Sequence, residues 1–239
     1  MGTRRTPPPD SRDLSRVQWA TVQTRTGPQH RYRDTATGRY ISARQVQADV
    51  TRMADTAGRD AARQLMEALR DRRISLADWQ MGMARAVKNV NYAAVAAASG
   101  GVNNMTAVER GRAGHIIREQ YKYLRGFAKD IESGKQPLDG RAIRRAEMYM
   151  DAARGSFAEQ KRAGFAGRHA GAVVMVRSHR HKRDSCRSCV GLDGKWFTMN
   201  SPEYIPVGRR ECNVNCGCTE ELGTLTADGT IVGAGLEGF

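Results

Sequence analysis

The last quarter of the chain is dominated by two motifs, Cys186-Arg-Ser-Cys189 and Cys212-Asn-Val-Asn-Cys216-Gly-Cys218. They are separated by 22 residues, and residues 1–185 contain no cysteine. A Cys-x-x-Cys turn brings two thiolates close enough to share one metal ion, and a second pair completes a tetrahedral site with Zn–S bonds of about 2.3 Å. The spacing therefore predicts a small module that is cross-linked by zinc, with its ligands drawn from these five cysteines.

The spacing does not select four ligands from the five cysteines, and His181 is a further candidate, although its basic surroundings favour an exposed loop. The alternatives are two disulfides with one free thiol, and reduced cysteines that bind no metal. No hydrophobic segment of the secretory type opens the sequence, and a reducing cytoplasm favours metal over disulfides. A site closed by four thiolates has no vacant position for a substrate, so the zinc ion is expected to be structural.

The formal net charge of +14 is unevenly distributed along the 239 residues. Residues 1–183 hold 35 basic and 17 acidic side chains, whereas residues 184–239 hold four basic and eight acidic ones. If the chain binds a polyanion, its N-terminal part and its helices should do so, and solvated arginine-rich helices are the alternative. Non-specific, salt-sensitive phosphate contacts are predicted for the four cations that precede the first cysteine, namely Arg177, Arg180, Lys182 and Arg183.

Residues 1–40 are expected to form an extended basic arm. Three consecutive prolines begin at Pro7 and impose polyproline geometry, and no sustained hydrophobic period follows as far as Gly38. Tyr32 and Tyr40 flank a short stretch that is also compatible with a tight hairpin. The longest apolar stretch of the chain covers residues 170–176, which is far too short to span a membrane.

Residues 41–168 carry the signals of four helices. The expected helices begin at Ser42, Ser75, Thr106 and about Arg141, and capping residues mark the first three starts. Apolar residues then recur at three-to-four spacing, which is typical of amphipathic helices. Alanine-lined stripes allow helices to approach closely, so this helical body is expected to pack as a bundle.

The pattern changes to short strands after residue 168. Strands are expected at residues 172–177 and 195–198, inside a cysteine-rich metal-knuckle module that spans residues 169–222. The remaining residues, 223–239, are expected to form a hairpin and tail, with Asp228-Gly229 as the turn pair. The predicted fold is mainly α: a bundle-like body with an extended N-terminal arm, followed by a small α+β zinc-knuckle domain.

No motif of the sequence indicates an active site. The string Gly233-Ala-Gly-Leu-Glu-Gly238 matches a dinucleotide-binding pattern, but no helix is expected after it to receive a phosphate. Metalloprotease, nucleophile-elbow and P-loop motifs are not found in the sequence. We therefore expect a protein that is not an enzyme.

One family resemblance rests on the cysteine motifs and the residues between them. The string from Cys186 to Trp196, the loop Pro206-Val-Gly208 and the final cysteine cluster resemble the C-terminal segment of tailed-phage minor head proteins, the head-morphogenesis family of the Mu F type. The resemblance covers roughly residues 170–220. Many members carry His-Pro before the last cysteines, where this chain has Gly208-Arg-Arg-Glu-Cys212.

The resemblance implies a virion protein, a minor capsid component that acts in viral assembly near the portal and the inner capsid surface. It would lie in the head interior or portal region, and in the host cytoplasm during assembly. Its implied partners are the portal protein, the major capsid or scaffold proteins and packaged DNA, with an oligomer in the virion as a further possibility and no membrane. The alternatives are a zinc-ribbon DNA-binding protein that regulates or processes DNA, and an enzyme domain fused to a head protein.

Overall fold

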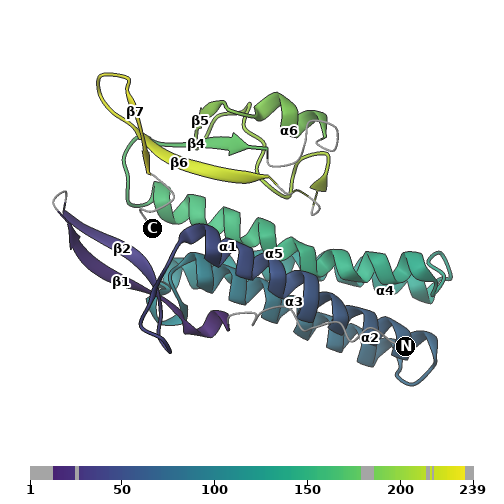
Figure 1. Ribbon diagram of the computed structural model, residues 1–239. Helices are drawn as coiled ribbons and strands as arrows, with labels where there is room; N and C mark the ends of the chain where they lie inside the picture. Colours follow the sequence, from purple (N-terminus) through teal and green to yellow (C-terminus); the bar gives the residue numbers. More distant parts are fainter. Residues whose placement is uncertain (1–12, 25–26, 179–185, 214–215, 217, 235–239) are drawn as a thin grey trace, which may run out of the picture.

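The computed structural model describes residues 13–24, 27–178, 186–213, 216 and 218–234, and it contains a helical body and two small antiparallel sheets (Figure 1). The helices are α1 (Ala43–Met53), α2 (Arg59–Arg70), α3 (Leu76–Ala98), α4 (Ala107–Glu132), α5 (Gly140–Ala166) and α6 (Arg187–Leu192). The strands are β1 (Val17–Thr24), β2 (Gly27–Asp34), β3 (Tyr40–Ile41), β4 (Ala172–Arg177), β5 (Trp196–Thr198), β6 (Thr219–Leu225) and β7 (Ile231–Ala234). Short irregular helical turns are Leu14–Arg16, Ala54–Gly58 and Val102–Asn104.

The four predicted helices are confirmed, and their starts are where the capping residues stand. The side chains of Ser42, Ser75 and Thr106 each accept a hydrogen bond from the backbone three residues later, and Asp139 caps α5. The first predicted helix is interrupted by the π-helical turn Ala54–Gly58, which lies between α1 and α2. A Cβ at Gly58 would lie 3.2 Å from the Cβ of Met150, so the absent side chain lets α5 pack closely there.

Buried and half-buried ion pairs hold α5 against the α1–α2 segment. The pairs are Asp55 with Arg154, Arg59 with Asp151 and Arg63 with Glu147. The Arg59–Asp151 pair is bidentate, with an Nη2–Oδ1 distance of 2.8 Å, and the Asp151 side chain is 3% exposed. Such forked geometry fixes both the distance and the register of the two antiparallel segments.

The N-terminal part differs from its prediction. Strands β1, β2 and β3 form an antiparallel sheet in the order β1-β2-β3, so the extended arm predicted for residues 1–40 is wrong where these strands lie. Residues 1–12 and 25–26 lie outside the described part of the chain. The sheet is anchored where Tyr32 is buried and its hydroxyl donates to the carbonyl oxygen of Ala98, 3.4 Å away. The hairpin considered between Tyr32 and Tyr40 is confirmed, because β2 pairs with β3 there.

The C-terminal part is a four-stranded antiparallel sheet in the order β5-β4-β6-β7, joined by α6. Both predicted strands are present, and so is the hairpin turn, in which Thr226 donates to the carbonyl of Thr230 and Gly229 has φ +83°. Strand β6 runs through residue 222, so the predicted hairpin shares one sheet with the cysteine-rich module. A mainly helical body followed by a small α+β unit is therefore what the structure contains.

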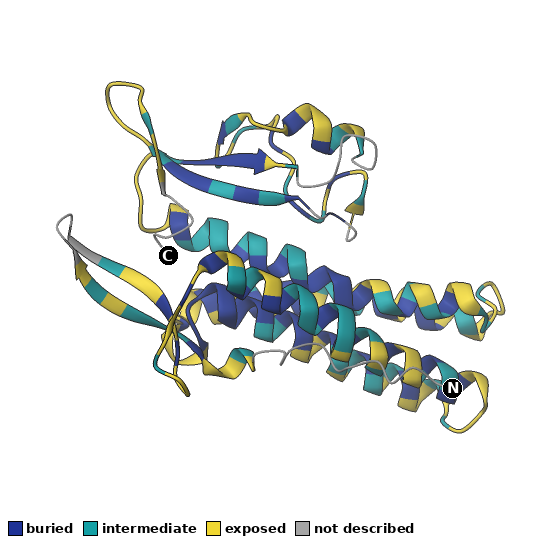
Figure 2. Cartoon of the chain, in the orientation of Figure 1, coloured by how far each residue is buried: buried dark blue, intermediate teal, exposed yellow. Residues whose placement is uncertain are grey.

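One hydrophobic core joins the helices to this sheet. Phe157 of α5, Val174 of β4 and Leu222 of β6 are all buried and belong to the same cluster. In Figure 2 the dark blue, buried positions continue from the helical body into β4 and β6. The C-terminal module is thus packed on the bundle and does not hang from it by a linker.

We predict that Gly100→Ala destabilises the chain much more than Gly134→Ala does. Both glycines have φ +74°, which costs a side chain about 1 to 2 kcal/mol. Only at Gly100 would the new Cβ meet another group, since it would lie 2.1 Å from the indole ring of Trp19. Overpacking adds about 1 to 3 kcal/mol, so urea unfolding of the two variants should differ by that amount. Equal losses would contradict the docking of β1 on the end of α3.

Candidate metal centre

The sheet register explains why two cysteine motifs far apart in sequence meet. Arg177, the last residue of β4, pairs with Thr219, the first residue of β6. The segment that leaves β4 and the segment that enters β6 therefore share one end of the sheet. Cys186 is the N-cap of α6, and Cys189 follows in its first turn.

The five sulfur atoms gather in two overlapping groups. Each group has its ligand atoms within 4.8 Å of one another; the groups are Cys186, Cys189 and Cys212, and Cys189, Cys216 and Cys218. The Sγ of Cys189 lies 3.6 Å from that of Cys212 and 3.7 Å from that of Cys216. Four sulfurs that surround one ion at 2.3 Å are about 3.8 Å apart, so these separations fit a shared metal.

All five cysteines are free thiols in the structure. The measured Sγ–Sγ separations far exceed the disulfide bond length of about 2.05 Å. Among the described residues, these two cysteine groups are the clusters of histidine, cysteine and carboxylate side chains that can hold a metal ion. The predicted gathering of the cysteines is therefore confirmed, and His181 lies outside the described residues.

The thiols of the cluster differ in acidity. The Cys218 thiol donates to Cys216, and this hydrogen bond together with the nearby Arg210 lowers the pKa of Cys216 to about 5. The same hydrogen bond, together with burial, raises the pKa of Cys218. Burial raises the pKa of Cys189 and Cys212. Cys216 is thus the thiol that is most ready to offer a thiolate.

Arg210 provides a buried positive charge beside the sulfurs. Its side chain is 0% exposed, and its Nη1 lies 3.7 Å from the Sγ of Cys216. Its Nε donates to the carbonyl oxygen of Ile205 at 2.8 Å. A guanidinium at this position offsets part of the negative charge that several thiolates around one divalent ion create.

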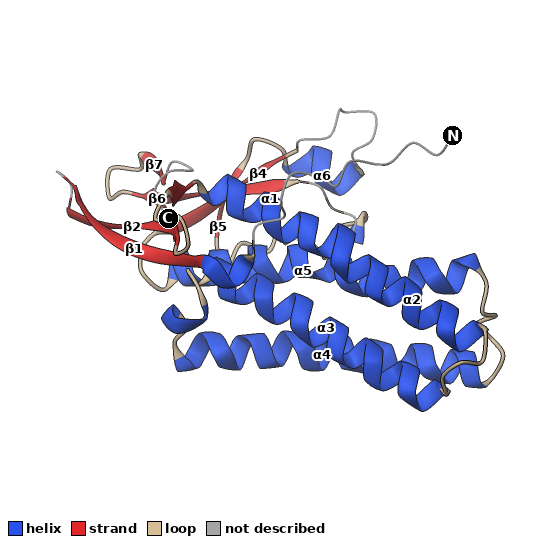
Figure 3. Cartoon of the chain, turned by 60° about the horizontal axis from the view of Figure 1, so that its bottom comes forward, coloured by secondary structure: helices blue, strands red, loops and turns tan. Residues whose placement is uncertain are grey.

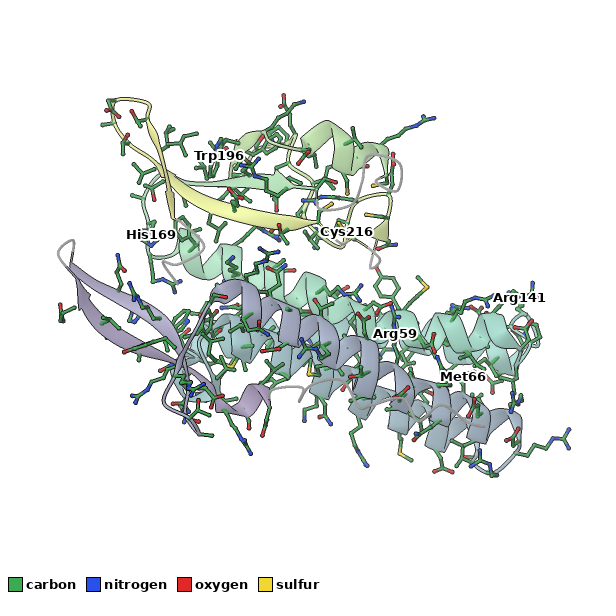
Figure 4. All side chains as sticks on the ribbon, in the orientation of Figure 1. Arg59, Met66, Arg141, His169, Trp196 and Cys216 are labelled. Atoms are coloured by element: carbon green, nitrogen blue, oxygen red, sulfur yellow. The ribbon has the colours of Figure 1, made fainter. Side chains whose placement is uncertain are left out.

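Glu220 links the cysteine cluster to the helical body. Its carboxylate pairs with Arg210 at 3.2 Å and with Arg162 of α5 at 2.6 Å. It also accepts from the hydroxyl of Tyr204 and from the backbone N–H of Val207. The side chain of Glu220 is only 5% exposed, so the network is shielded from water. Cys216 lies on the side of the module that faces these helices (Figure 4).

The predicted nucleic-acid contacts are only partly described. Arg177 is half exposed and pairs with Glu221 of the neighbouring strand at an Nε–Oε1 distance of 3.1 Å, so its charge is balanced. Arg180, Lys182 and Arg183 lie outside the described residues. Of the four predicted cations, the structure therefore describes Arg177 alone, and that residue is paired.

Sequence reasoning missed Arg210 and Glu220. A signal was present, because Glu220 sits at an inward position of β6, two residues before the buried Leu222. A carboxylate at an inward position needs a buried cation as its partner. The sequence did not indicate which of the many arginines supplies that cation.

No protein-family model matches the chain, and no curated protein and no solved structure is similar to it at a significant level. No helix among the described residues combines the length and the apolarity that a membrane span requires. The site is thus defined by its own geometry: a cluster of thiols next to a buried arginine, held on α5 by a shared carboxylate.

We predict that Glu220→Gln loosens the C-terminal module. The neutral amide leaves Arg162 and Arg210 without a carboxylate, and breaking a buried pair costs about 3 to 5 kcal/mol. Hydrogen exchange of β4 and β6 should accelerate accordingly. Glu221→Gln is the matched control, because its partner Arg177 is exposed and such pairs contribute about 1 kcal/mol or less. Similar exchange in both variants would contradict a linking role for Glu220.

Proposed function

We propose that the chain is a non-enzymatic structural protein of a tailed-phage head, whose C-terminal module is made rigid by one zinc ion. The observation that carries the proposal is the convergence of the same cysteines on which the minor-head resemblance rests. A thiolate-only site has no vacant position for a substrate, which supports a structural role. The module is docked on α5 through Glu220, so a rigid module would present a fixed surface to a partner.

We assign the four zinc ligands to Cys186, Cys189, Cys212 and Cys216. Cys189 belongs to both cysteine groups, and its Sγ lies 3.6 Å from that of Cys212 and 3.7 Å from that of Cys216. Cys186 completes a Cys-x-x-Cys pair with it. Cys218 remains as a buried thiol that donates to Cys216, which is the kind of outer hydrogen bond that orients and tunes a metal ligand.

We predict one zinc ion per purified chain, lost in Cys189→Ser and in Cys186→Ser but retained in Cys218→Ser. The measurement is elemental analysis together with alkylation of accessible thiols. Chelation should increase hydrogen exchange in residues 186–222 while the helical circular dichroism persists, because the long helices also pack on one another away from the cysteines, as Trp79 does on Phe127 and Phe127 on Tyr149. Retention of zinc by Cys186→Ser with loss in Cys218→Ser would reverse the ligand assignment. Freely alkylated thiols without any metal would overturn the zinc site.

We infer that the partners are the portal protein and the major capsid or scaffold proteins, with DNA nearby. The basic helical body supports this inference, because neutralising phosphates is favourable where DNA is densely packed. The acidic balance of residues 184–239 supports a protein partner for the metal module.

Purified head particles provide the decisive test of this role. We predict that mass spectrometry of particles from the virus that encodes the chain detects it at low copy number. Cys189→Ser should reduce its incorporation, since the docking module would lose its metal. Absence of the wild-type chain from complete particles would overturn the head assignment. Binding to one defined DNA sequence would instead favour the zinc-ribbon regulator.

A further inference from the structure

A row of cations lies on the outer surface of α4. Arg118, Lys122, Arg125 and Lys129 are all exposed and stand at positions i, i+4, i+7 and i+11. At 100° per residue these four positions fall within a narrow arc of the helix, and at 1.5 Å per residue they extend over about 16 Å. They form a single straight stripe.

Helix α3 widens the stripe into a face. The hydroxyl of Tyr121 on α4 donates to the carbonyl oxygen of Ala84 on α3 at 3.1 Å, which places the two helices side by side at this level. Arg85 and Lys88 are exposed on α3 next to that contact. We call these six cations the α3–α4 basic face. Figure 3 shows α3 and α4 on one side of the bundle, with the four-stranded sheet and α6 on the other.

The charge of this face is largely unbalanced. Within the described residues, Lys122 pairs with Glu119 at 2.6 Å, whereas the five other cations form no salt bridge. The arginines between α2 and α5 behave differently, because Arg59 and Arg63 are paired with acids. Pairing therefore separates structural arginines from those whose charge is available to a ligand.

The cavity beside the cysteine cluster is a weaker candidate for an anion. It has a volume of 610 Å³ and is lined by several cations. Two of these, Arg154 and Arg162, pair there with Asp55 and Glu220. The anion attraction of the cavity is therefore already offset by its own acids.

We propose that the α3–α4 basic face binds the phosphate backbone of duplex DNA without reading its sequence. This inference rests on the proposed function, because a phage head is the place where the chain would meet duplex DNA. Beside these six cations, two large apolar side chains, Met81 and Tyr123, are exposed nearby on α3 and α4, so charged groups predominate over apolar ones there. A stable protein interface needs an apolar centre, whereas phosphate binding needs only cations in register. Because the face lies away from the metal module, DNA and a protein partner can be bound together.

The test uses the full-length, metal-loaded chain and a duplex of mixed sequence, with affinity measured by fluorescence anisotropy at several salt concentrations. The logarithm of the affinity falls linearly with the logarithm of the salt concentration, and each phosphate contact makes this slope steeper by about 0.9. In the variant R118Q/K122Q/R125Q/K129Q the magnitude of the slope should therefore fall by about 3 to 4. Adding R85Q/K88Q should reduce the magnitude of the slope by about 2 more. Circular dichroism checks that the helices persist, as glutamine is a good helix former.

A charge-matched control separates this face from general attraction. The variant R16Q/R70Q/R73Q/R141Q removes four exposed arginines that are paired with Asp13, Asp71 and Asp139. Its slope should change by about 1 or less. An equal loss in both variants would overturn the proposal, because net charge alone would then explain binding. Wild-type binding by the stripe variant, with loss in R177Q/R180Q/K182Q/R183Q, would overturn it in favour of the segment before the first cysteine.

Failure of this inference can be told apart from failure of the proposed function. A wild-type chain that enters head particles but shows no salt-dependent DNA binding keeps the head assignment and loses the DNA face. Capture of an acidic protein by the face, without DNA binding, has the same consequence. DNA binding through the face by a chain that never enters particles keeps the face and loses the head assignment.

Discussion

The carboxylate of Glu220 is the interaction on which the C-terminal half of the molecule depends. It is buried between Arg162, which belongs to the helical body, and Arg210, which lies against the sulfur cluster. Neither arginine is stable in a dry interior without that carboxylate, and the carboxylate is not stable without them. The carboxylate consequently connects the metal site to α5, and the apolar core that continues from the helices into β4 and β6 reinforces the connection.

The helices were predictable because each carries its own local signals. Ser75 and Thr106 cap their helices in the structure as their sequence spacing indicates, and no distant residue is needed to specify them. Strand β4 was predictable for a similar reason, as it is short, apolar and buried. The β1–β2 pair was not, because most of its side chains are polar and only a few, such as Val17 and Tyr32, are buried at its base. Its position depends on Trp19 reaching Gly100, a contact between residues far apart in the sequence.

Part of the candidate metal centre was likewise predictable from the sequence and part was not. Cysteine spacing alone indicated that the sulfurs meet, since metal ligands obey a short-range geometric rule. The topology that brings them together, with β4 and β6 paired so that both motifs leave one end of the sheet, was not available from spacing. The partners of Glu220 were equally hidden, because 58 residues separate it from Arg162. A charged residue at a buried position indicates that a partner of opposite charge is present, but the sequence does not show which residue it is.

The net charge of the chain can be interpreted by separating the cations that form ion pairs from those that do not. A value of +14 is compatible with solvated helices and with polyanion binding alike. Ion pairing assigns Arg59, Arg63 and Arg162 to internal structure, and each of them is compensated where it lies. The cations of α3 and α4 are left largely uncompensated and aligned, so part of the excess positive charge is concentrated on that face. Cations that are aligned on α3 and α4, away from the acidic, cysteine-rich module, agree with the proposal that the chain contacts DNA on one side and a protein partner on another.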